Sequence, residues 1–372
     1  MEASTYRRAL PEDAIEFASP AGKQMFAEAL AAGGLDGYFA LAEQFHTQAE
    51  PAFCGLGSLV VALNALAIDP GRSWKGPWRW FSEELLDCCV PLEQIRERGI
   101  DLDELACLAR CNGARVELTR AEGDDERAWR AALVASARGE VVVIAAYDRA
   151  VLGQTGQGHY SPIGGYSAAR DAALVLDVAR FKYPPHWIGA SRLWAAMRAI
   201  DPATSRSRGW LALRRGAPDA VLGFSLSCGA DGWRGLAAEI AALEPLLATM
   251  TDVGELARLI APLGHHVVAR DHGAEEARAA VAATRVALHR LALYAPIVAA
   301  VGSEGADAAA LLVLAFAAQL APRVRTVIAA DVSAAALDVA LAAQLAALTA
   351  QAAALGAVRE ARSACADRCA GA

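Results

Sequence analysis

The sequence predicts an α+β domain followed by an all-helical domain. Residues 47–66 contain Cys54 and end in the apolar run LVVALNAL, which is long enough for a buried helix. From Glu140 the pattern changes to short β-rich runs separated by turn residues, which indicates an antiparallel sheet. From about Gly235 the chain is rich in Ala and Leu at helical spacing. We therefore expect a helix that carries Cys54 to pack on an antiparallel sheet, and a separate helical bundle to follow.

The expected domain limits follow from shifts in composition. After Arg215 the segment GAPDAVLG has the turn-forming residues of a linker. We therefore predict an α+β domain in residues 1–215, a linker in residues 216–234 and an Ala-rich helical domain in residues 235–372. All candidate catalytic residues fall in the first of these.

The composition sets the broad class of protein. The 372 residues are 55% hydrophobic and carry a formal net charge of −7, so the chain can bury a large core and is a poor candidate for nucleic-acid binding. The N-terminus lacks the apolar core of a secretory signal, and the Ala-rich stretches 308–321 and 339–358 are interrupted by Gln or Thr. We expect a cytoplasmic protein without a membrane span, whose eight cysteines are reduced.

Local signals place the elements before the strand region. The segment FASPAGKQMFAEALAAGG has a Ser-Pro start and a Gly-Gly stop, which predicts a helix. Residues 101–118 read as a helix that stops at Gly113 and continues as a strand. Four aromatic residues crowd around Pro and Gly turns, and we favour a packed corner of the core over a substrate-stacking surface for Trp74, Trp78, Trp80 and Phe81.

A cysteine at the start of a predicted helix is a candidate nucleophile. Pro51 disfavours helix for the residue before it, and Gly55, Gly57 and the apolar run follow Cys54. Unsatisfied N–H groups and the helix dipole at such a position favour a thiolate over a thiol. Gln48, six residues upstream, could bend back over the cysteine and help its backbone N–H to hold an oxyanion. The alternative is a buried structural cysteine, and this stretch alone does not decide between the two.

The strand region contains a predicted hairpin that carries a histidine and an aspartate. Its two arms are the runs HYSPIGGYSA and ALVLDVARF. His159 and Asp177 lie eighteen residues apart on these arms, and their shared parity allows both to point to one face. Asp177 is a carboxylate in an otherwise apolar run, where a buried acid needs a partner. A short helix at residues 193–200 and a last strand at residues 209–213 should follow.

These residues together suit acyl transfer. A nucleophilic cysteine needs a base within hydrogen-bond reach and a third group that orients the base. Cysteine on a helix, histidine on a strand and an orienting residue on the adjoining strand is the arrangement of papain-like hydrolases. A core histidine paired with a core aspartate is the plainer alternative, but it leaves Cys54 and Gln48 unexplained.

Five long motifs give the sequence a resemblance to a known family. They occur in one order between Tyr6 and about Trp210, and they are TQAEPAFCGL, LNALAIDPGRSWKGPWRWF, LDCCVPLE, GQGHYSPIGGY and LDVARFKYPPHW. The sequence resembles the phytochelatin synthases of the eukaryotic type. The resemblance implies a papain-like catalytic domain with Cys54, His159 and Asp177 as triad and Gln48 as the oxyanion glutamine. The helical C-terminal domain shows no recognisable match, and we expect it to be variable and to regulate or stabilise the enzyme.

The resemblance also implies a reaction. Glutathione would acylate the cysteine through its γ-glutamylcysteinyl group, glycine would leave, and the acyl group would pass to the amine of another glutathione or of a growing phytochelatin. Such an acyltransferase would act in heavy-metal detoxification and in the response to cadmium. The glutamyl end of the donor carries a carboxylate and an ammonium, so we expect a fixed cation nearby and select Arg180, Lys182 and Tyr183 as candidates for substrate recognition. A solvated strand end is the alternative for these three.

A heavy-metal ion is the implied activator. The resemblance implies cadmium, and Zn or Cu as further metals, bound as a glutathione thiolate substrate, to the protein, or both, with no organic cofactor. The pairs Cys88–Cys89 and Cys107–Cys111 are the candidate soft-ligand positions, because thiolates bind soft metals. A spacing of four also places Cys107 and Cys111 on one helical face. Two ligands do not make a site, and we favour structural thiols over metal ligands.

Two other functions compete with phytochelatin synthesis. A glutathione hydrolase of the same fold would use the same triad and release γ-glutamylcysteine. A non-catalytic metal-buffering protein is less consistent with eight cysteines that form no CxC array. The expected partners are glutathione, metal-glutathione complexes and phytochelatins, with neither nucleic acid nor membrane, and a homodimer is compatible with the sequence.

Overall fold

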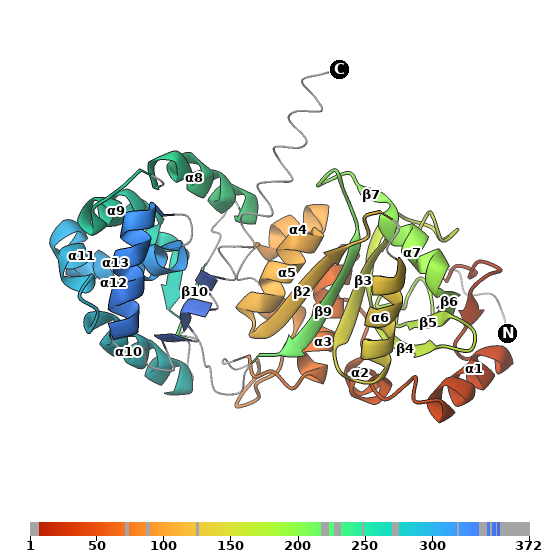
Figure 1. Cartoon of the computed structure of the whole chain (residues 1–372). Coiled ribbons are helices and arrows are strands. Elements are labelled where there is room, and N and C mark those ends of the chain that lie inside the picture. Colours follow the sequence, from red (N-terminus) through yellow and green to blue (C-terminus); the bar gives the residue numbers. More distant parts are fainter. Residues whose placement is uncertain are drawn as a thin grey trace, which may run out of the picture. The chain divides into compact units, whose positions relative to one another are not determined.

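The structure is a computed structural model of the chain (Figure 1). It describes residues 7–70, 74–86, 90–123, 126–216, 223–226, 232–247, 249–269, 275–317, 320–334, 341–342, 344–346 and 348–349. The chain forms two compact units. The first comprises residues 1–68, 80–87 and 92–216, and the second comprises residues 69–79, 88–91 and 217–372.

A seven-stranded sheet forms the centre of the first unit, with the strand order β1-β6-β5-β4-β3-β9-β2. Its strands are β1 (Ile15–Glu16), β2 (Ala114–Arg120), β3 (Val142–Asp148), β4 (Gly158–Ser167), β5 (Ala172–Val175), β6 (His186–Gly189) and β9 (Gly209–Arg215). All neighbouring strands pair antiparallel, as the sequence predicts. A separate two-stranded pair joins β7 (Ile200–Asp201) to β8 (Arg206–Ser207).

The predicted hairpin is the β4–β5 pair, and its far end differs from expectation. Ser167 pairs with Ala172 at the turn, and the register shifts between Ile163 and Gly165. Such a bulge changes the direction in which the side chains of its strand point. Because β5 ends at Val175, Asp177 lies in the irregular segment beyond the strand and not within it.

Glycines allow the N-terminal segment to approach this hairpin closely. A Cβ atom at Gly165 would collide with the side chain of Leu35, and one at Gly34 would collide with the carbonyl oxygen of Tyr166. The Tyr166 N–H in turn donates to the Gly34 carbonyl at 3.0 Å. The Gly33-Gly34 pair therefore both ends the first helix and docks the chain against β4.

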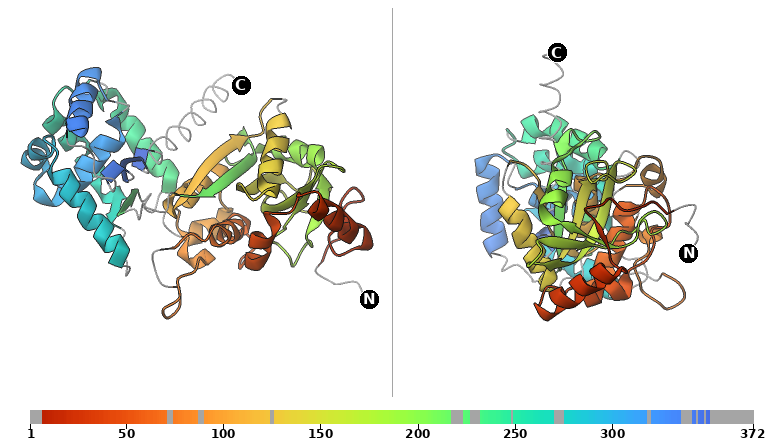
Figure 2. Two further views of the ribbon diagram at one scale, coloured as in Figure 1. Left: turned by 60° about the horizontal axis from the view of Figure 1, so that its bottom comes forward. Right: turned by 90° about the vertical axis from the view of Figure 1, so that its right-hand side faces the viewer.

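Helices cover both faces of the sheet. They are α1 (Pro20–Ala31), α2 (Tyr38–Gln44), α3 (Cys54–Ala65), η1 (Glu83–Leu85), α4 (Leu92–Arg98), α5 (Leu102–Cys111), α6 (Glu126–Ala137) and α7 (Ala190–Arg198). Figures 1 and 2 show α6 and α7 on one face and α3 on the other. Buried Trp129 of α6 and Leu193 of α7 pack on alternate residues of β3, including Val143 and Ala145. The Cys54 helix thus lies against the opposite face of the sheet.

The sequence signals for helix ends are confirmed in two cases. Ser19 caps α1 by accepting from the Gly22 N–H at 3.0 Å, with Pro20 as the first helical residue. Helix α5 ends at Cys111, and Gly113 then adopts a φ of 89°, a value that favours glycine. Strand β2 begins at the next residue, as predicted.

The second unit is mainly helical. Its helices are α8 (Gly232–Leu247), α9 (Val253–Ile260), η2 (Ala261–His266), α10 (Glu275–His289), α11 (Tyr294–Val301), α12 (Ser303–Ala315) and α13 (Pro322–Ala334). Helix α12 is buried along most of its length, so the part of the Ala-rich run 308–321 that lies in this helix contributes to the core. Among the described residues, no single helix has the length and apolarity to cross a membrane, and one pair that reaches them together, Arg278–His289 with Tyr294–Val301, is bent by 99°.

The expectation of an all-helical C-terminal domain is wrong in one respect. Strand β10 (Phe224–Leu226), inside the predicted linker 216–234, pairs antiparallel with β11 (Val267–Ala269). The Gln344 side chain accepts from the Phe224 N–H and donates to its carbonyl, both at 2.8 Å. Three-residue strands give too short a pattern for recognition by periodicity, and the side chain that completes their hydrogen bonds is 120 residues away.

The expected packed corner of aromatic residues is also wrong for the tryptophans. Trp74, Trp78 and Trp80 are 37%, 71% and 43% exposed, and only Phe81 of the four is buried. Lys75 and Trp78 form an isolated bridge around a tight turn, and such a turn presents its side chains to solvent. The Lys75 ammonium lies 4.6 Å from the centre of the Trp74 ring.

Candidate active site

Cys54 is the first residue of α3, as the sequence predicts, and its side chain is partly exposed. Gly55 and Gly57 lie in the first turn of α3, where the lack of a side chain leaves room for neighbouring segments of the same chain. A Cβ atom at Gly57 would lie 3.0 Å from Glu83 Oε1 and 3.2 Å from Gln48 Cβ. The backbone N–H groups of Tyr160 and Gly55 lie near the Cys54 sulfur and lower its pKa. The cysteine is therefore held against β4, beside the residue that follows His159.

His159 and Asp177 form the predicted pair. Nε2 of His159 lies 3.0 Å from Asp177 Oδ1, and both side chains are buried. A carboxylate only accepts, so Nε2 carries the proton and Nδ1 keeps its lone pair. The Ala179 N–H donates to the same carboxylate at 2.9 Å. Asp177 therefore fixes the tautomer in which His159 can act as a base through Nδ1.

Arg149 is a member of the site that the sequence analysis missed. Its Nη2 donates to Oδ1 and Oδ2 of Asp177 at 2.9 and 2.7 Å, and the pair is almost completely buried. Arg149 lies in the turn-rich segment between β3 and β4, where the sequence predicts that an arginine is exposed to solvent. The sequence feature that could have indicated such a residue was Asp177, because a buried carboxylate requires a cation or several hydrogen-bond donors.

The hydrogen bonds continue behind Arg149. Its Nη1 donates to Gln154 Oε1 at 2.5 Å, and Gln154 Nε2 lies 3.1 Å from His186 Nε2. His186 Nδ1 lies 2.9 Å from the Pro184 carbonyl, so Nδ1 carries the proton and Nε2 accepts from Gln154. Each of these hydrogen bonds has a defined donor and acceptor, and together they hold the Arg149 guanidinium in place.

The electrostatics favour a neutral histidine in the absence of substrate. Burial and the positive charge of Arg149 lower the pKa of His159 to about 4. Burial alone would raise the pKa of Asp177, but the charges of His159 and Arg149 hold it well below its usual range. The carboxylate is therefore ionised and the imidazole is neutral at physiological pH.

The expectation that the helix start makes Cys54 a thiolate is not confirmed. Burial raises the pKa of the Cys54 thiol, and this outweighs the opposing effects of the Tyr160 N–H, the Arg149 charge and the Gly55 N–H. The physical reason is the loss of solvation of a charged sulfur. Burial therefore opposes the effect of the helix start on the pKa of Cys54.

Gln48 lies over the first turn of α3, but its amide is engaged locally. Its Nε2 donates to the carbonyl oxygens of Glu50 at 2.7 Å and Pro51 at 2.9 Å. Its backbone N–H donates to the Val178 carbonyl at 3.0 Å, which ties the segment before Cys54 to the segment that carries Asp177. The side chain thus lies near the nucleophile with both amide protons already in use.

The three predicted substrate residues have different environments. Tyr183 is buried, its hydroxyl accepts from the Thr155 N–H at 2.7 Å, and its ring lies 5.0 Å from the Arg149 guanidinium carbon. Its ring therefore packs against the Arg149 guanidinium. Lys182 lies over the loop before β4, where a Cβ atom at Gly156 would be 3.1 Å from its Nζ. Arg180 lines an open pocket.

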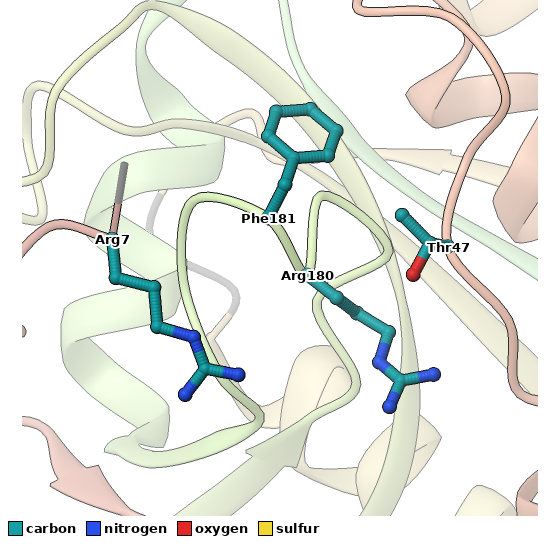
Figure 3. Close-up of a pocket in the computed structure, with 4 residues that line it drawn as sticks. All are labelled: Arg7, Thr47, Arg180 and Phe181. Atoms are coloured by element: carbon teal, nitrogen blue, oxygen red, sulfur yellow. The ribbon is translucent and has the colours of Figure 1, made fainter. Parts of the chain in front are cut away.

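That pocket has a volume of about 450 Å³ and is lined by Arg7, Thr47, Arg180 and Phe181. Figure 3 shows the guanidinium groups of Arg7 and Arg180 extending to the same side, with the Thr47 hydroxyl near Arg180. Thr47 directly precedes Gln48 in the sequence. The chain segment that leads to Cys54 therefore forms one wall of a cationic pocket.

Of the predicted metal ligands, Cys88 and Cys89 lie outside the described residues. Cys107 and Cys111 lie side by side on α5, with sulfur atoms 3.8 Å apart in the core. Among the residues that the structure describes, no third His, Cys, Asp or Glu completes a group with them. Both thiols are buried, and the choice between a structural and a metal-binding role for them stays a prediction.

Comparison with known proteins agrees with this geometry. The phytochelatin synthase family matches residues 5–210. Glutathione gamma-glutamylcysteinyltransferase 1 of Triticum aestivum is 52% identical over 237 residues, which is 63% of this chain and 47% of that protein. The enzyme of that name from Arabidopsis thaliana is 48% identical over 260 residues, or 69% of this chain and 54% of that protein. The Schizosaccharomyces pombe relative is 45% identical over 217 residues, or 57% and 52% of the two chains.

The chain spans about half the length of the curated relatives it matches. The matched region contains Cys54, His159 and Asp177 together with Arg149. On the extent of this match, the chain belongs to the phytochelatin synthase family.

Proposed function

We propose that this chain is a γ-glutamylcysteine dipeptidyltransferase that makes phytochelatins from glutathione through an acyl-enzyme on Cys54. The observation that carries the proposal is the buried His159–Asp177 pair beside a cysteine at a helix start, within the region that matches the family. The names of the relatives describe the same transfer, and the Cys54 helix packed against an antiparallel sheet supports a papain-like fold.

In the first half-reaction, the Cys54 sulfur attacks the carbonyl carbon of the cysteinyl-glycine amide of glutathione. Nδ1 of His159 takes the thiol proton as the C–S bond forms, and Asp177 stabilises the resulting imidazolium through Nε2. The tetrahedral oxyanion then collapses, the C–N bond breaks, and the imidazolium gives its proton to the departing glycine amine. The product is a thioester of γ-glutamylcysteine on Cys54.

In the second half-reaction, the free amine of another glutathione attacks the thioester carbonyl. His159 accepts a proton from that amine, and the proton passes to the Cys54 thiolate as the C–S bond breaks. Water in place of the amine would give hydrolysis with the same residues, so transfer depends on holding an acceptor and limiting water. We propose that cadmium enters the reaction as a glutathione thiolate complex that serves as this acceptor.

The oxyanion requires donors near Cys54. The Cys54 backbone N–H at the start of α3 is one candidate, and we propose that the Gln48 amide supplies the second. Because both amide protons bond to the Glu50 and Pro51 carbonyls, Gln48 must release at least one of these bonds when the oxyanion forms.

The pocket beside Gln48 suits the carboxylates of glutathione. Arg7 and Arg180 place two guanidinium groups on one pocket, and guanidinium binds carboxylate with two parallel hydrogen bonds. Because Thr47 forms its wall one residue before Gln48, a substrate held there can extend toward Cys54. We propose Arg180 and Lys182 as substrate contacts and Tyr183 as a support of Arg149.

We further propose that the second unit modulates the reaction. All residues of the proposed mechanism belong to the first unit. A chain truncated near Pro218 should still be acylated by glutathione if this division is right. Absence of acylation in a truncated protein with a native circular dichroism spectrum would contradict it.

The test of the proposed function is incubation of the purified protein with glutathione, with and without cadmium, followed by mass analysis of the products. Oligomers of γ-glutamylcysteine ending in glycine are expected, together with free glycine. Glycine and γ-glutamylcysteine without oligomers would identify a glutathione hydrolase and overturn the transferase proposal.

A further inference from the structure

A cluster of three metal-ligating side chains lies in the second unit, to which no residue of the proposed mechanism belongs. Glu239 belongs to α8, and His265 and His266 are the last two residues of η2. Their ligand atoms all lie within 4.8 Å of one another. Among the residues that the structure describes, this is the one group of three or more His, Cys, Asp or Glu side chains with such spacing.

The two histidines are oriented as metal ligands are. Nδ1 of His265 lies 2.7 Å from the Pro262 carbonyl, so Nδ1 carries the proton and Nε2 keeps its lone pair. A hydrogen bond from one ring nitrogen to a backbone carbonyl is the usual support of a histidine that binds a metal through the other nitrogen. Nε2 of His266 faces Glu239 Oε2 at 3.3 Å.

The spacing of these two atoms fits a small tetrahedral cation. Bonds of about 2.0–2.1 Å at tetrahedral angles place two ligand atoms roughly 3.3–3.4 Å apart, and Nε2 of His266 lies 3.3 Å from Oε2 of Glu239. A plain ion pair between them is the alternative, but it gives no role to His265. The rings of His265 and His266 lie with centroids 3.8 Å apart, so the two imidazoles are close neighbours beside Glu239.

The cluster is closed on one side and open on the other. The His266 side chain is 4% exposed, whereas the Glu239 side chain is 47% exposed. A buried ligand supplies a fixed anchor, and an exposed carboxylate can adjust to the ion. Solvent can reach the remaining coordination position.

We propose that Glu239, His265 and His266 bind a divalent cation of borderline softness, Zn²⁺ or Cd²⁺, through Nε2 of both histidines and Oε2 of Glu239. Two imidazoles and one carboxylate form a donor set typical of zinc sites, whereas Mg²⁺ and Ca²⁺ prefer oxygen alone. The fourth position takes water, or a thiolate from a small thiol ligand. This site shares no residue with the candidate cysteine positions and does not depend on the proposed transferase function.

Binding should join two parts of the second unit. The ion would link α8 to η2, and η2 leads directly into β11, the partner of β10. A ligand that binds the folded state alone raises its stability in proportion to the logarithm of the ligand concentration. Metal should therefore raise the unfolding temperature of the second unit.

The experiment uses the full-length protein after removal of bound metal with a chelator. Zn²⁺ affinity is measured by competition with a chromophoric chelator, and Co²⁺ absorption reports the ligand type, because thiolate ligands add a charge-transfer band in the near ultraviolet that nitrogen and oxygen ligands lack. Thermal unfolding is recorded with and without Zn²⁺. His265→Ala and Glu239→Gln test the site. His289→Ala is the matched control, because His289 pairs with Asp307 at 3.1 Å in the same unit outside the cluster.

We expect one site with a Co²⁺ spectrum free of the thiolate band, and a Zn²⁺-dependent rise in unfolding temperature. His265→Ala and Glu239→Gln should weaken Zn²⁺ binding by at least the ~10- to 100-fold that loss of even an outer-shell partner costs, and should abolish the rise. His289→Ala should behave as wild type. Equal Zn²⁺ affinity and an equal rise in the wild type and both cluster variants would overturn the proposal, whatever the outcome of the glutathione assay.

Discussion

Replacement of Arg149 by Met is expected to destabilise the first unit strongly. The substitution keeps an apolar stem but removes both donors to Asp177, and the two side chains are only 3% and 0% exposed. Breaking a buried ion pair by removing one partner costs about 3–5 kcal/mol, because the other charge stays buried without compensation. For a unit of this size, about 2–4 °C per kcal/mol gives a fall of roughly 6–20 °C in unfolding temperature.

The same substitution should change the pH dependence of catalysis. The positive charge of Arg149 is one cause of the low pKa of His159, which is about 4. Without that charge, the pKa of His159 rises, so the acidic limb of kcat/KM should move to higher pH. A purely structural role for Arg149 would lower stability and leave this limb where it is.

Thermal unfolding by tryptophan fluorescence and the pH profile of glycine release are the measurements. Arg192→Met is the matched control, because Arg192 pairs with Asp13 at 3.0 Å on the surface of the same unit, where an ion pair contributes about 0–1 kcal/mol. If Arg149→Met unfolds within about 2 °C of Arg192→Met and keeps the wild-type pH profile, the assigned role of the buried pair is wrong.

Four further outcomes are expected. Cys54→Ser should abolish glycine release with the fold intact, and retained release would remove Cys54 as nucleophile. Asp177→Asn leaves the Arg149 charge buried without its partner, so it should lose stability as Arg149→Met does, and its folded fraction should lose about 10⁴-fold in kcat through the wrong His159 tautomer. Gln48→Ala should lose roughly 100- to 1,000-fold, and an unchanged rate would mean that backbone N–H groups alone hold the oxyanion. Because the pKa of His159 falls to about 4 on folding, from about 6.5 in the unfolded chain, the unfolded state binds more protons between these values. His159 should therefore contribute a loss of about 3 kcal/mol in the wild type as pH falls from 6.5 to 4, and chemical denaturation should show a smaller loss in His159→Gln, where the buried His186, whose pKa is also lowered, still contributes.

The fold of the first unit could be predicted where the sequence carries local signals. The Ser19 cap, the glycine after α5 and the β-rich runs of β4 and β5 each act over a few residues, so their positions can be read from the sequence. Asp177 could be paired with His159 because the two residues have the same parity on the arms of a predicted hairpin and Asp177 stands out in an apolar run. The β10–β11 pair could not be predicted, because a side chain far along the chain completes its hydrogen bonds.

The pKa shifts and buried charges of the site were harder to predict from the sequence than the fold. A helix start predicts a low thiol pKa for Cys54, but burial raises it, and burial depends on the packing of α3 against β4. Arg149 could not be assigned, because a turn-rich segment says nothing about which side chains turn inward. The Gln48 position agrees with an oxyanion role by proximity to the first turn of α3, whereas its present hydrogen bonds depend on the local loop.

The central claim is that Cys54, with His159 as its base, accepts the γ-glutamylcysteinyl group of glutathione. The most direct test is to mix the protein with glutathione, quench at short times in acid, and map the acylated residue by mass spectrometry of its peptides. The claim predicts a γ-glutamylcysteinyl thioester on the peptide that contains Cys54, with glycine released in equal amount and no adduct in Cys54→Ser. A thioester on another cysteine, or glycine release by Cys54→Ser at the wild-type rate, would contradict it.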